Sequence, residues 1–241
     1  MKMNLTRNFL DQKFSVNKKI ILEKSSTHHL LKVLRKKEED KIILFDGKGN
    51  SCLGVITSVS RSKLELEIID VFERTLRSGV DINLGQSLIK TDPLHLIIQK
   101  ATELGIVSFS PLITDHSVAK IKMTKNRSNK WRLIARGACE QCGENWLPVI
   151  KDPVKLDKWA GIARSKIKIV LYPKADNKIS DLDYKDSVSL AIGPEGDFTR
   201  YEVDSLTEKG FIPVTIGKRI LRAETAAISA ISSVRFGAKE F

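Results

Sequence analysis

Two segments near the end of the 241-residue chain place charged residues beside glycines, a pattern typical of ligand-binding loops. They are residues 190–199 and 216–226, and each begins at the end of an apolar, strand-like run and continues into a helix-like run. Ligands of open α/β sheets bind just outside the carboxyl ends of the strands. Gly193, Gly196 and Gly217 allow the backbone to approach a ligand closely. One such loop alone is an ordinary strand-to-helix turn, but two of them favour a shared ligand site.

Several common catalytic motifs are absent from the sequence. Neither loop has the G-x-G-x-x-G pattern of dinucleotide sites, and there is no P-loop motif. The sequence has no Gly-x-Ser-x-Gly turn, and its four scattered histidines do not suggest a catalytic triad. Cys139 and Cys142 have C-x-x-C spacing but lack a second ligand pair, so we interpret them as structural thiols on a helix and expect no bound metal.

The charge of the chain indicates a polyanionic partner. There are 41 Lys and Arg against 29 Asp and Glu, a formal net charge of +12. A basic protein with no nucleic-acid partner can have the same total, but here the bases are clustered. Residues 114–136 contain seven basic side chains and one acidic one, and residues 35–37 are Arg-Lys-Lys. Such clusters favour phosphate binding.

The sequence carries no sign of a membrane or secretory protein. Its apolar runs are far too short to span a bilayer. The first 11 residues lack the apolar stretch of a signal peptide. We therefore expect a cytoplasmic protein without a membrane partner.

From residue 80 onward, strand-like and helix-like segments alternate, which predicts a mostly parallel sheet covered on both faces. The predicted strands are residues 81–89, 106–113, 167–172, 188–192 and 211–216. The predicted helices are residues 92–104, 126–142, 156–164, 200–209 and 223–236. Asp92-Pro93 is interpreted as an N-cap followed by a proline at the first helical position. Thr199 and Glu202 form a capping box, and Gly105 and Gly210 end two helices.

The first 72 residues are predicted to form a small β-barrel. Its strands are residues 19–22, 41–45, 52–58 and 64–71, and residues 46–50 form a turn between two of them. A helix is predicted over residues 26–36. Residues 73–79 are interpreted as a hinge-like linker.

The two loops, written Ile192-Gly-Pro-Glu-Gly196 and Gly217-x-Arg-Ile-Leu-Arg-x-Glu-Thr-Ala226, resemble the SPOUT class of methyltransferases. More closely, the chain resembles the RsmE-type enzymes, which methylate N3 of a uridine in 16S ribosomal RNA. Further matches are His29-x-x-x-Val33-Leu-Arg35, Phe45-Asp-Gly47, Gln99-Lys-Ala-Thr-Glu-Leu-Gly105 and Ala138-Cys-Glu-Gln-Cys142. One departure is Asp197, where the family usually has a second glycine. Because Asp tolerates left-handed backbone, we expect the turn to be kept.

The resemblance implies an α/β fold with a C-terminal trefoil knot, preceded by a PUA-like RNA-binding barrel. The implied division is residues 1–72 for the barrel, 73–79 for the linker and 80–241 for the SPOUT domain. It also implies S-adenosylmethionine as cofactor and a homodimer. The implied RNA partner is ribosomal RNA within the assembled or nearly assembled small subunit. The apolar stripe of the last helix is explained by core packing, and the resemblance adds a dimer interface as a hypothesis.

Methyl transfer from a sulfonium requires mainly positioning of the nucleophile. Uracil N3 carries a proton at neutral pH, so this proton must be removed or the anion stabilised. The resemblance points to Arg222 for stabilising negative charge on the base carbonyls. Glu224 is interpreted either as the base or as the ion-pair partner that orients Arg222.

The cofactor-binding residues follow from the same resemblance. The RNA-binding candidates are basic side chains, each of which can instead be an ordinary solvated cation, and the resemblance favours Arg35 and Arg136 among them. The cofactor-binding residues are Leu171, Tyr172, Gly193, Pro194, Glu195, Gly196, Ile216, Gly217, Ile220, Leu221 and Thr225, of which Thr225 can instead cap the last helix. The RNA-binding residues are Arg7, Arg35, Lys36 and Lys37 in the barrel and Lys100, Arg132 and Arg136 in the second domain. Such contacts are made mainly to phosphates.

Three other functions compete with this reading. A SPOUT enzyme that methylates ribose 2′-OH has similar loops, but the 138–142 motif and the barrel favour base methylation. A non-catalytic RNA-binding protein can retain the fold, although the intact pair of loops argues against a loss of catalytic activity. A metal-dependent nuclease is disfavoured because no carboxylates have the spacing of metal ligands.

Overall fold

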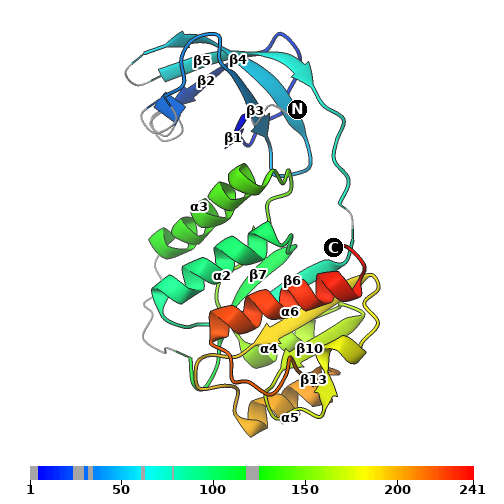
Figure 1. The fold of residues 1–241 in the computed structure, drawn as a ribbon. Helices are drawn as coiled ribbons and strands as arrows, with labels where there is room; N and C mark the ends of the chain where they lie inside the picture. Colours follow the sequence, from blue (N-terminus) through cyan, green and yellow to red (C-terminus); the bar gives the residue numbers. More distant parts are fainter. Residues whose placement is uncertain (1–4, 24–29, 32–34, 61–62, 78, 118–124) are drawn as a thin grey trace. The chain divides into compact units, whose positions relative to one another are not determined.

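The computed structural model describes residues 5–23, 30–31, 35–60, 63–77, 79–117 and 125–241. The chain divides into two compact units. The first comprises Met1–Arg77 and Cys139–Leu147, and the second comprises Ser78–Ala138 and Pro148–Phe241. Figure 1 shows the elements of each unit.

The first unit is a five-stranded sheet with the order β1-β3-β4-β5-β2. Its strands are β1 (Thr6–Phe9), β2 (Lys19–Glu23), β3 (Lys41–Phe45), β4 (Ser51–Val59) and β5 (Lys63–Val71). The four predicted strands are confirmed, whereas β1 was missed because its short sequence, TRNF, has no apolar alternation. β1 pairs with β3 in parallel, and the other pairs are antiparallel.

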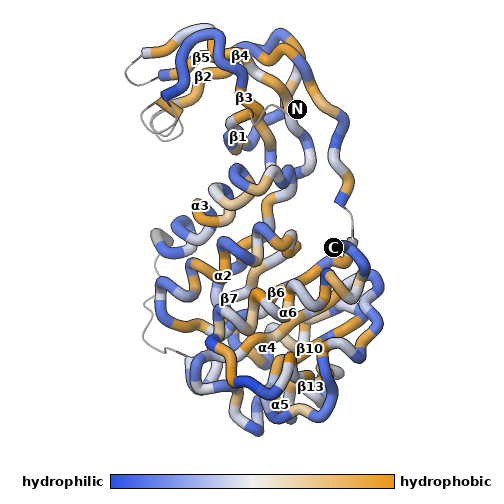
Figure 2. The backbone as a smooth tube through the Cα atoms, in the orientation of Figure 1, coloured by the Kyte–Doolittle hydropathy of each residue, from blue (hydrophilic) through white to orange (hydrophobic). Residues whose placement is uncertain are grey.

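Alternating apolar residues of this sheet form its core. In β5, Leu64, Leu66 and Ile68 are fully buried while Lys63 and Glu65 are exposed, so the predicted period of two is confirmed. Figure 2 shows that hydrophobic and hydrophilic stretches of backbone both occur along the strands of this sheet. Two register shifts between β4 and β5 bend the sheet around this core. The predicted helix over residues 26–36, with His29 and Val33 of the family motif, lies mostly outside the described residues.

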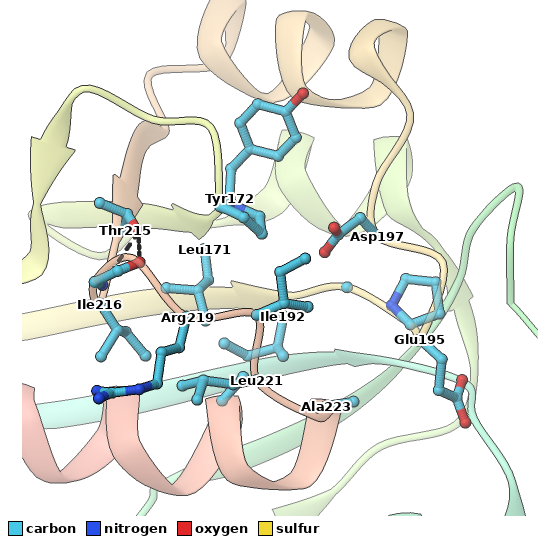
Figure 3. A pocket seen from close by; sticks show the side chains of 16 residues that line it. Leu171, Tyr172, Ile192, Glu195, Asp197, Thr215, Ile216, Arg219, Leu221 and Ala223 are labelled. Atoms are coloured by element: carbon cyan, nitrogen blue, oxygen red, sulfur yellow. Dashed lines mark hydrogen bonds between the residues drawn. The ribbon is translucent and has the colours of Figure 1, made fainter.

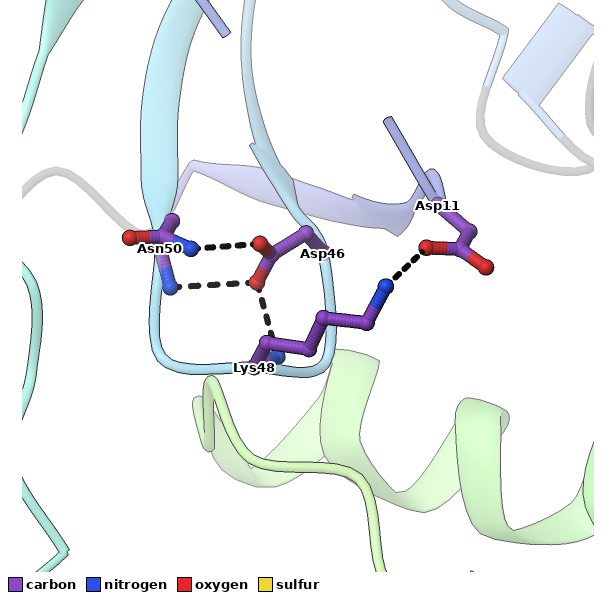
Figure 4. Close-up of polar contacts among 4 residues, drawn as sticks. All are labelled: Asp11, Asp46, Lys48 and Asn50. Atoms are coloured by element: carbon purple, nitrogen blue, oxygen red, sulfur yellow. Dashed lines mark hydrogen bonds and ion pairs between the residues drawn. The ribbon is translucent and has the colours of Figure 1, made fainter. Parts of the chain in front are cut away.

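The predicted turn at residues 46–50 is confirmed, and Asp46 organises it. Oδ1 of Asp46 accepts hydrogen bonds from the backbone N–H groups of Lys48 at 2.7 Å and Asn50 at 3.1 Å (Figure 4). Its Oδ2 accepts a bond from the Asn50 amide at 2.5 Å. Gly47 and Gly49 adopt positive φ angles of 72° and 92°, which favour glycine. The Lys48 ammonium forms an exposed ion pair with Asp11 at 2.7 Å.

The first part of the predicted linker is hydrogen-bonded to the first unit. The backbone N–H of Thr75 donates to Gly49 O at 2.9 Å, and the indole N–H of Trp146 donates to Thr75 O at 2.9 Å. The guanidinium carbons of Arg74 and Arg77 lie 4.9 and 4.6 Å from the Trp146 ring centroid. These contacts explain why residues 139–147 belong to the first unit, although residues 139–142 are part of a helical pattern in the sequence.

The second unit has an eight-stranded sheet with the order β11-β13-β10-β12-β6-β7-β8, and β9 also pairs with β7. Its strands are β6 (Asp81–Ser87), β7 (Ser108–Ile113), β8 (Val149–Ile150), β9 (Val154–Lys155), β10 (Ile167–Leu171), β11 (Asn177–Lys178), β12 (Ser187–Ile192) and β13 (Ile212–Thr215). Its helices are α2 (Thr91–Glu103), α3 (Lys125–Cys142), α4 (Leu156–Ile162), the short 3-10 helix η2 (Ile179–Asp181), α5 (Arg200–Glu208) and α6 (Ala223–Gly237). Every described pair of neighbouring strands in this sheet is parallel, which confirms the predicted α/β class.

Helices cover this sheet. Successive residues Ile169 and Val170 of β10 point to opposite faces, and both are fully buried. α4 and α5 share an apolar cluster with Val170. α2 packs against α6, and the two lie side by side across the sheet in Figure 1.

Two predicted N-caps are wrong and one is confirmed, and Gly105 and Gly210 follow the ends of α2 and α5 with positive φ angles as predicted. α2 is capped by Lys90, which makes no side-chain cap bond, so Asp92 and Pro93 lie inside its first turn rather than at the cap. Acidic residues and proline are both tolerated in a first turn, where backbone N–H groups have no helical partner. The N-cap of α6 is Arg222, so Thr225 does not cap that helix. The capping box of Thr199 and Glu202 is present as predicted.

Candidate active site

The carboxyl ends of three adjacent strands bring the two glycine-bearing loops together. β10 lies between β12 and β13 in the sheet, so the loops after residues 171, 192 and 215 emerge side by side. They enclose one pocket, shown in Figure 3. The residues that line it are Leu171, Tyr172, Pro173, Ile192, Gly193, Pro194, Glu195, Asp197, Thr215, Ile216, Gly217, Arg219, Ile220, Leu221, Ala223 and Ala226.

The predicted cofactor residues therefore lie together, with two exceptions. All of them line the pocket except Gly196 and Thr225. Sequence reasoning missed Ile192, Ala223 and Ala226, together with Pro173, Asp197, Thr215 and Arg219. Most of these are direct neighbours of predicted residues, and the two alanines lie one helical turn apart on α6.

Apolar side chains cover one part of the pocket, and polar groups contribute about equally to its lining. Ile192, Ala223 and Ala226 are buried, at 2%, 5% and 9% exposure, and bring small or branched carbon surfaces to it. In Figure 3 the side chains of Leu171, Ile192 and Leu221 converge, whereas the carboxylate of Glu195 points away from them. Ile220 is 87% exposed. Such a lining suits the face of a flat heteroaromatic ring, with the loop backbone available for its polar edge.

The first loop is a tight turn. The backbone N–H of Asp197 donates to Pro194 O at 3.0 Å, and Asp197 has a left-handed φ of 57°, so the expectation that Asp keeps the turn is confirmed. A Cβ atom on Gly193 would come within 3.2 Å of the Phe198 backbone nitrogen. Burial raises the pKa of Asp197, and Lys174 and His116 oppose that rise.

Gln86 supports the start of this loop from inside the sheet. Its side chain is fully buried at the end of β6, and its Nε2 donates to Gly193 O at 3.2 Å. The sequence analysis did not single it out. A buried amide requires a hydrogen-bond partner, but the sequence of this strand, DINLGQS, mixes polar and apolar residues and does not show that Gln86 is buried.

The second loop is held by Thr215. Its hydroxyl donates to Gly217 O at 3.0 Å and accepts from Gly217 N–H at 3.2 Å. The predicted catalytic residues follow this loop. Arg222 is exposed at the N-cap of α6, and Glu224 is half-buried in the first turn. Neither lines the pocket, but the pocket residues Leu221 and Ala223 flank Arg222 in the chain.

The predicted RNA-binding residues of the first unit have different environments. Arg35 and Lys37 are exposed, and Lys36 is half-buried. Arg7 is half-buried, donates to Asn145 Oδ1 at 2.5 Å and lies 4.9 Å above the Phe45 ring. Burial lowers the Arg7 pKa. These contacts give Arg7 a packing role that its sequence did not reveal.

In the second unit, the predicted RNA-binding residues lie on α2 and α3. Lys100 forms an ion pair with Glu103 at 2.9 Å. Arg132 donates to Asn129 Oδ1 at 3.2 Å, and Arg136 is half-buried on α3. The ion pair reduces the charge that Lys100 presents to a polyanion.

The two cysteines of the C-x-x-C motif have different environments. Cys139 is buried, which raises the pKa of its thiol to about 12, whereas Cys142 is exposed. A buried thiol with a high pKa is a poor nucleophile and a poor metal ligand. Among the described residues, no group of three or more His, Cys, Asp or Glu side chains is arranged to hold a metal ion. None of the helices in the described part of the chain has the length and apolarity needed to cross a membrane.

Comparison with known proteins gives two family matches. Residues 76–235 match an RNA methyltransferase domain, and residues 22–69 match an RNA methyltransferase PUA domain. Ribosomal RNA small subunit methyltransferase E of Buchnera aphidicola (strain Sg) is 34% identical over 243 residues, which cover 98% of this chain and 99% of the relative. The Bacillus subtilis protein of the same name is 31% identical over 221 residues, covering 87% and 86% of the two chains.

Two solved structures share the whole fold. A ribosomal RNA small subunit methyltransferase E from Neisseria gonorrhoeae, bound to S-adenosyl methionine, has a TM-score of 0.90 at 30% identity and covers 97% of this chain and 98% of its own. A Legionella pneumophila methyltransferase in complex with the same cofactor has a TM-score of 0.92 at 30% identity, with the same coverage.

Proposed function

Because the chain belongs to the RNA methyltransferase family, with a PUA domain before its methyltransferase domain, we propose that it methylates N3 of a uridine in 16S ribosomal RNA. S-adenosylmethionine is the methyl donor in this proposal. The observation that carries it is the pocket that the loops after β10, β12 and β13 share at the carboxyl ends of these strands.

The residues of the pocket fit this cofactor. Leu171, Ile192 and Leu221 provide apolar surface for the adenine, and the backbone of the two loops provides donors and acceptors for its edge. The small side chain of Ala226 leaves space in the lining that a larger side chain would fill. We assign the role of holding the cofactor to the predicted residues that line the pocket. Gly196 then acts as part of the loop around the pocket. A contact between Thr225 and the cofactor requires a movement of the loop or of the helix end.

When bound, the sulfonium supplies an electrophilic methyl group. The protein must then hold uracil N3 in line and accommodate the loss of its proton. Arg222 at the N-cap of α6 stabilises negative charge on the uracil carbonyls, and it is flanked by pocket residues on both sides. Glu224 takes the N3 proton or orients Arg222.

The first unit and the basic residues of the second bind the RNA in this proposal. Residues 1–72 form the PUA-like domain, residues 73–79 the linker and residues 80–241 the catalytic domain, which contains the trefoil knot. Two copies form a dimer, and the enzyme acts in the cytoplasm on the assembled or nearly assembled small subunit. Support comes from the net charge of +12 and from the exposed cations Arg35 and Lys37.

The test is mass spectrometry of 16S ribosomal RNA from cells with and without this protein. One methyl group, a gain of about 14 daltons by the CH₂ difference, should be lost without it, and nucleoside digestion should identify 3-methyluridine. Methylation of purified small subunits by the protein and S-adenosylmethionine should restore the mark. A 2′-O-methylated nucleoside would support the ribose enzyme instead, and no cofactor binding in calorimetry would support a non-catalytic RNA-binding protein.

Arg222→Ala should lower kcat by about 100- to 1,000-fold, the usual effect of removing one electrostatic contact to a transition state. The Kd for S-adenosylmethionine should change less than about threefold, because Arg222 does not line the pocket. Single-turnover methylation and calorimetry measure the two quantities. Glu224→Gln separates its two roles, since a base is lost in Gln but a hydrogen-bond partner of Arg222 is partly kept. Equal kcat values for wild type and Arg222→Ala would remove Arg222 from the mechanism.

A further inference from the structure

The end of the cofactor loop is attached to a separate turn of the second unit, residues 114–117 after β7. Nδ1 of His116 lies 2.9 Å from Gly196 O and 3.0 Å from Asp197 O. Both partners are carbonyl oxygens, so Nδ1 must carry a hydrogen and donate it. A Cβ atom on Gly196 would lie 3.3 Å from Cβ of His116, which shows how closely the two segments approach.

A second set of bonds holds His116 in this place. Oε1 of buried Glu202 accepts from the backbone N–H of Asp115 at 3.0 Å, and its Oε2 accepts from Thr199 N–H at 2.9 Å. The Ser117 hydroxyl donates to Thr114 O at 2.7 Å and closes the turn on itself. The position of the His116 ring is therefore fixed from both sides of the contact.

Apolar burial does not explain the ring, because His116 is exposed. Among the described residues, the side chains that hydrogen-bond to the backbone of residues 193–197 are those of Gln86 and His116. Gln86 holds the first residue of this segment, and His116 holds the last two. Between them lie Pro194 and Glu195, which line the pocket.

We propose that His116 is a positioning residue for the cofactor loop: its imidazole holds the carbonyls of Gly196 and Asp197 so that residues 193–197 keep the shape that binds S-adenosylmethionine. This inference rests on the proposed function and adds to it a residue outside the pocket lining. Because the ring acts through the loop, its loss should weaken cofactor binding rather than the transfer step.

His116→Ala should raise the Kd for S-adenosylmethionine about tenfold, the effect expected from losing two modest hydrogen bonds in a loop that must then order on binding. At saturating cofactor, kcat should fall less than about threefold. His116→Arg is the matched control, because a guanidinium donates to two carbonyls. It should keep the Kd within about threefold of wild type, whereas His116→Leu should behave like His116→Ala.

The pH dependence of the Kd for S-adenosylmethionine distinguishes this role from simple packing, which would give no such dependence. The two carbonyls raise the pKa of His116, with smaller contributions in the same direction from Glu202 and Asp115. Asp197 faces it on the loop, and Lys174 lies near Asp197. Since the protonated ring donates more strongly, the added affinity is present at low pH and declines as pH rises through the raised pKa. The wild-type Kd should therefore rise severalfold more between pH 6 and 8.5 than the Kd of His116→Arg.

Calorimetric titration of the full chain with S-adenosylmethionine tests the role of His116. Equal cofactor affinity in wild type, His116→Ala and His116→Leu would overturn the inference while leaving the proposed function intact. A wild-type protein that does not bind S-adenosylmethionine would instead overturn the proposed function. If His116→Ala unfolds, the comparison of His116→Arg with wild type across pH still tests the role, and parallel profiles would contradict it.

Discussion

Ala226→Leu is expected to weaken S-adenosylmethionine binding about 100-fold, which corresponds to about 2.7 kcal/mol. Ala226 is 9% exposed, and its methyl group forms part of the pocket lining on α6. A leucine places three more carbon atoms there, and protein interiors are packed too densely to absorb them without displacing neighbours or ligand. The neighbouring lining residues Ile192 and Ala223 are themselves buried, so the added carbons have no free volume except the pocket.

The measurement is calorimetric titration with the cofactor, together with thermal unfolding without it. Glu208→Leu is the matched control, because it adds the same side chain at an exposed site on α5 that is outside the pocket lining. It should bind the cofactor as wild type does. Without ligand, Ala226→Leu should unfold within a few degrees of wild type. Unchanged affinity in a folded Ala226→Leu protein would mean that this pocket does not hold the cofactor.

The sequence predicted the pocket because its main parts are local patterns. An apolar run followed by glycine, proline and charge is readable in ten residues, and β-sheet topology then brings two such loops together. Local patterns could not assign Ala223 and Ala226 to the pocket. Helical periodicity shows which face of α6 is apolar, but core, dimer interface and ligand pocket all require an apolar face.

His116 and Gln86 show the limit of local patterns. His116 contacts residues 80 and 81 positions away in the chain, so its partners depend on the tertiary fold. Its sequence neighbourhood is polar and basic, and the four histidines were dismissed together. Gln86 was not recognised because its strand, DINLGQS, contains several polar side chains, and the sequence does not show which of them is buried.

Arg7 and residues 139–147 have contacts that the sequence did not reveal, for a related reason. Arg7 was assigned to RNA by charge, but its guanidinium is bonded to Asn145, which lies 138 residues further along the chain. A helical pattern that runs from residue 125 to 142 gives no sign that its residues from 139 onward belong to the first unit. Charge and periodicity report what a residue can do, whereas its partners depend on contacts distant in sequence.

Arg235→Ala is expected to lower the free energy of unfolding by about 3–5 kcal/mol, the usual cost of breaking a buried, hydrogen-bonded ion pair. Arg235 lies on α6 with 8% of its side chain exposed, and its Nη1 pairs with Glu240. Its Nε donates to Leu104 O at 3.0 Å, and its Nη2 donates to Gly105 O at 2.5 Å. Truncation would leave these carbonyls and a mostly buried carboxylate without their partner.

An ion pair elsewhere in the same unit is the natural comparison. Arg200 and Asp204 are paired at 3.0 Å on α5, but their side chains are 78% and 54% exposed. Water and salt screen such a pair, so Arg200→Ala should cost only about 0.3–0.5 kcal/mol. Urea unfolding of both variants gives the two energies under one set of conditions. Equal losses would show that burial does not strengthen the Arg235 contacts. A large loss for Arg235→Ala alone would mean that α6, which carries Arg222 and the pocket alanines, depends on the contact of Arg235 with the end of α2.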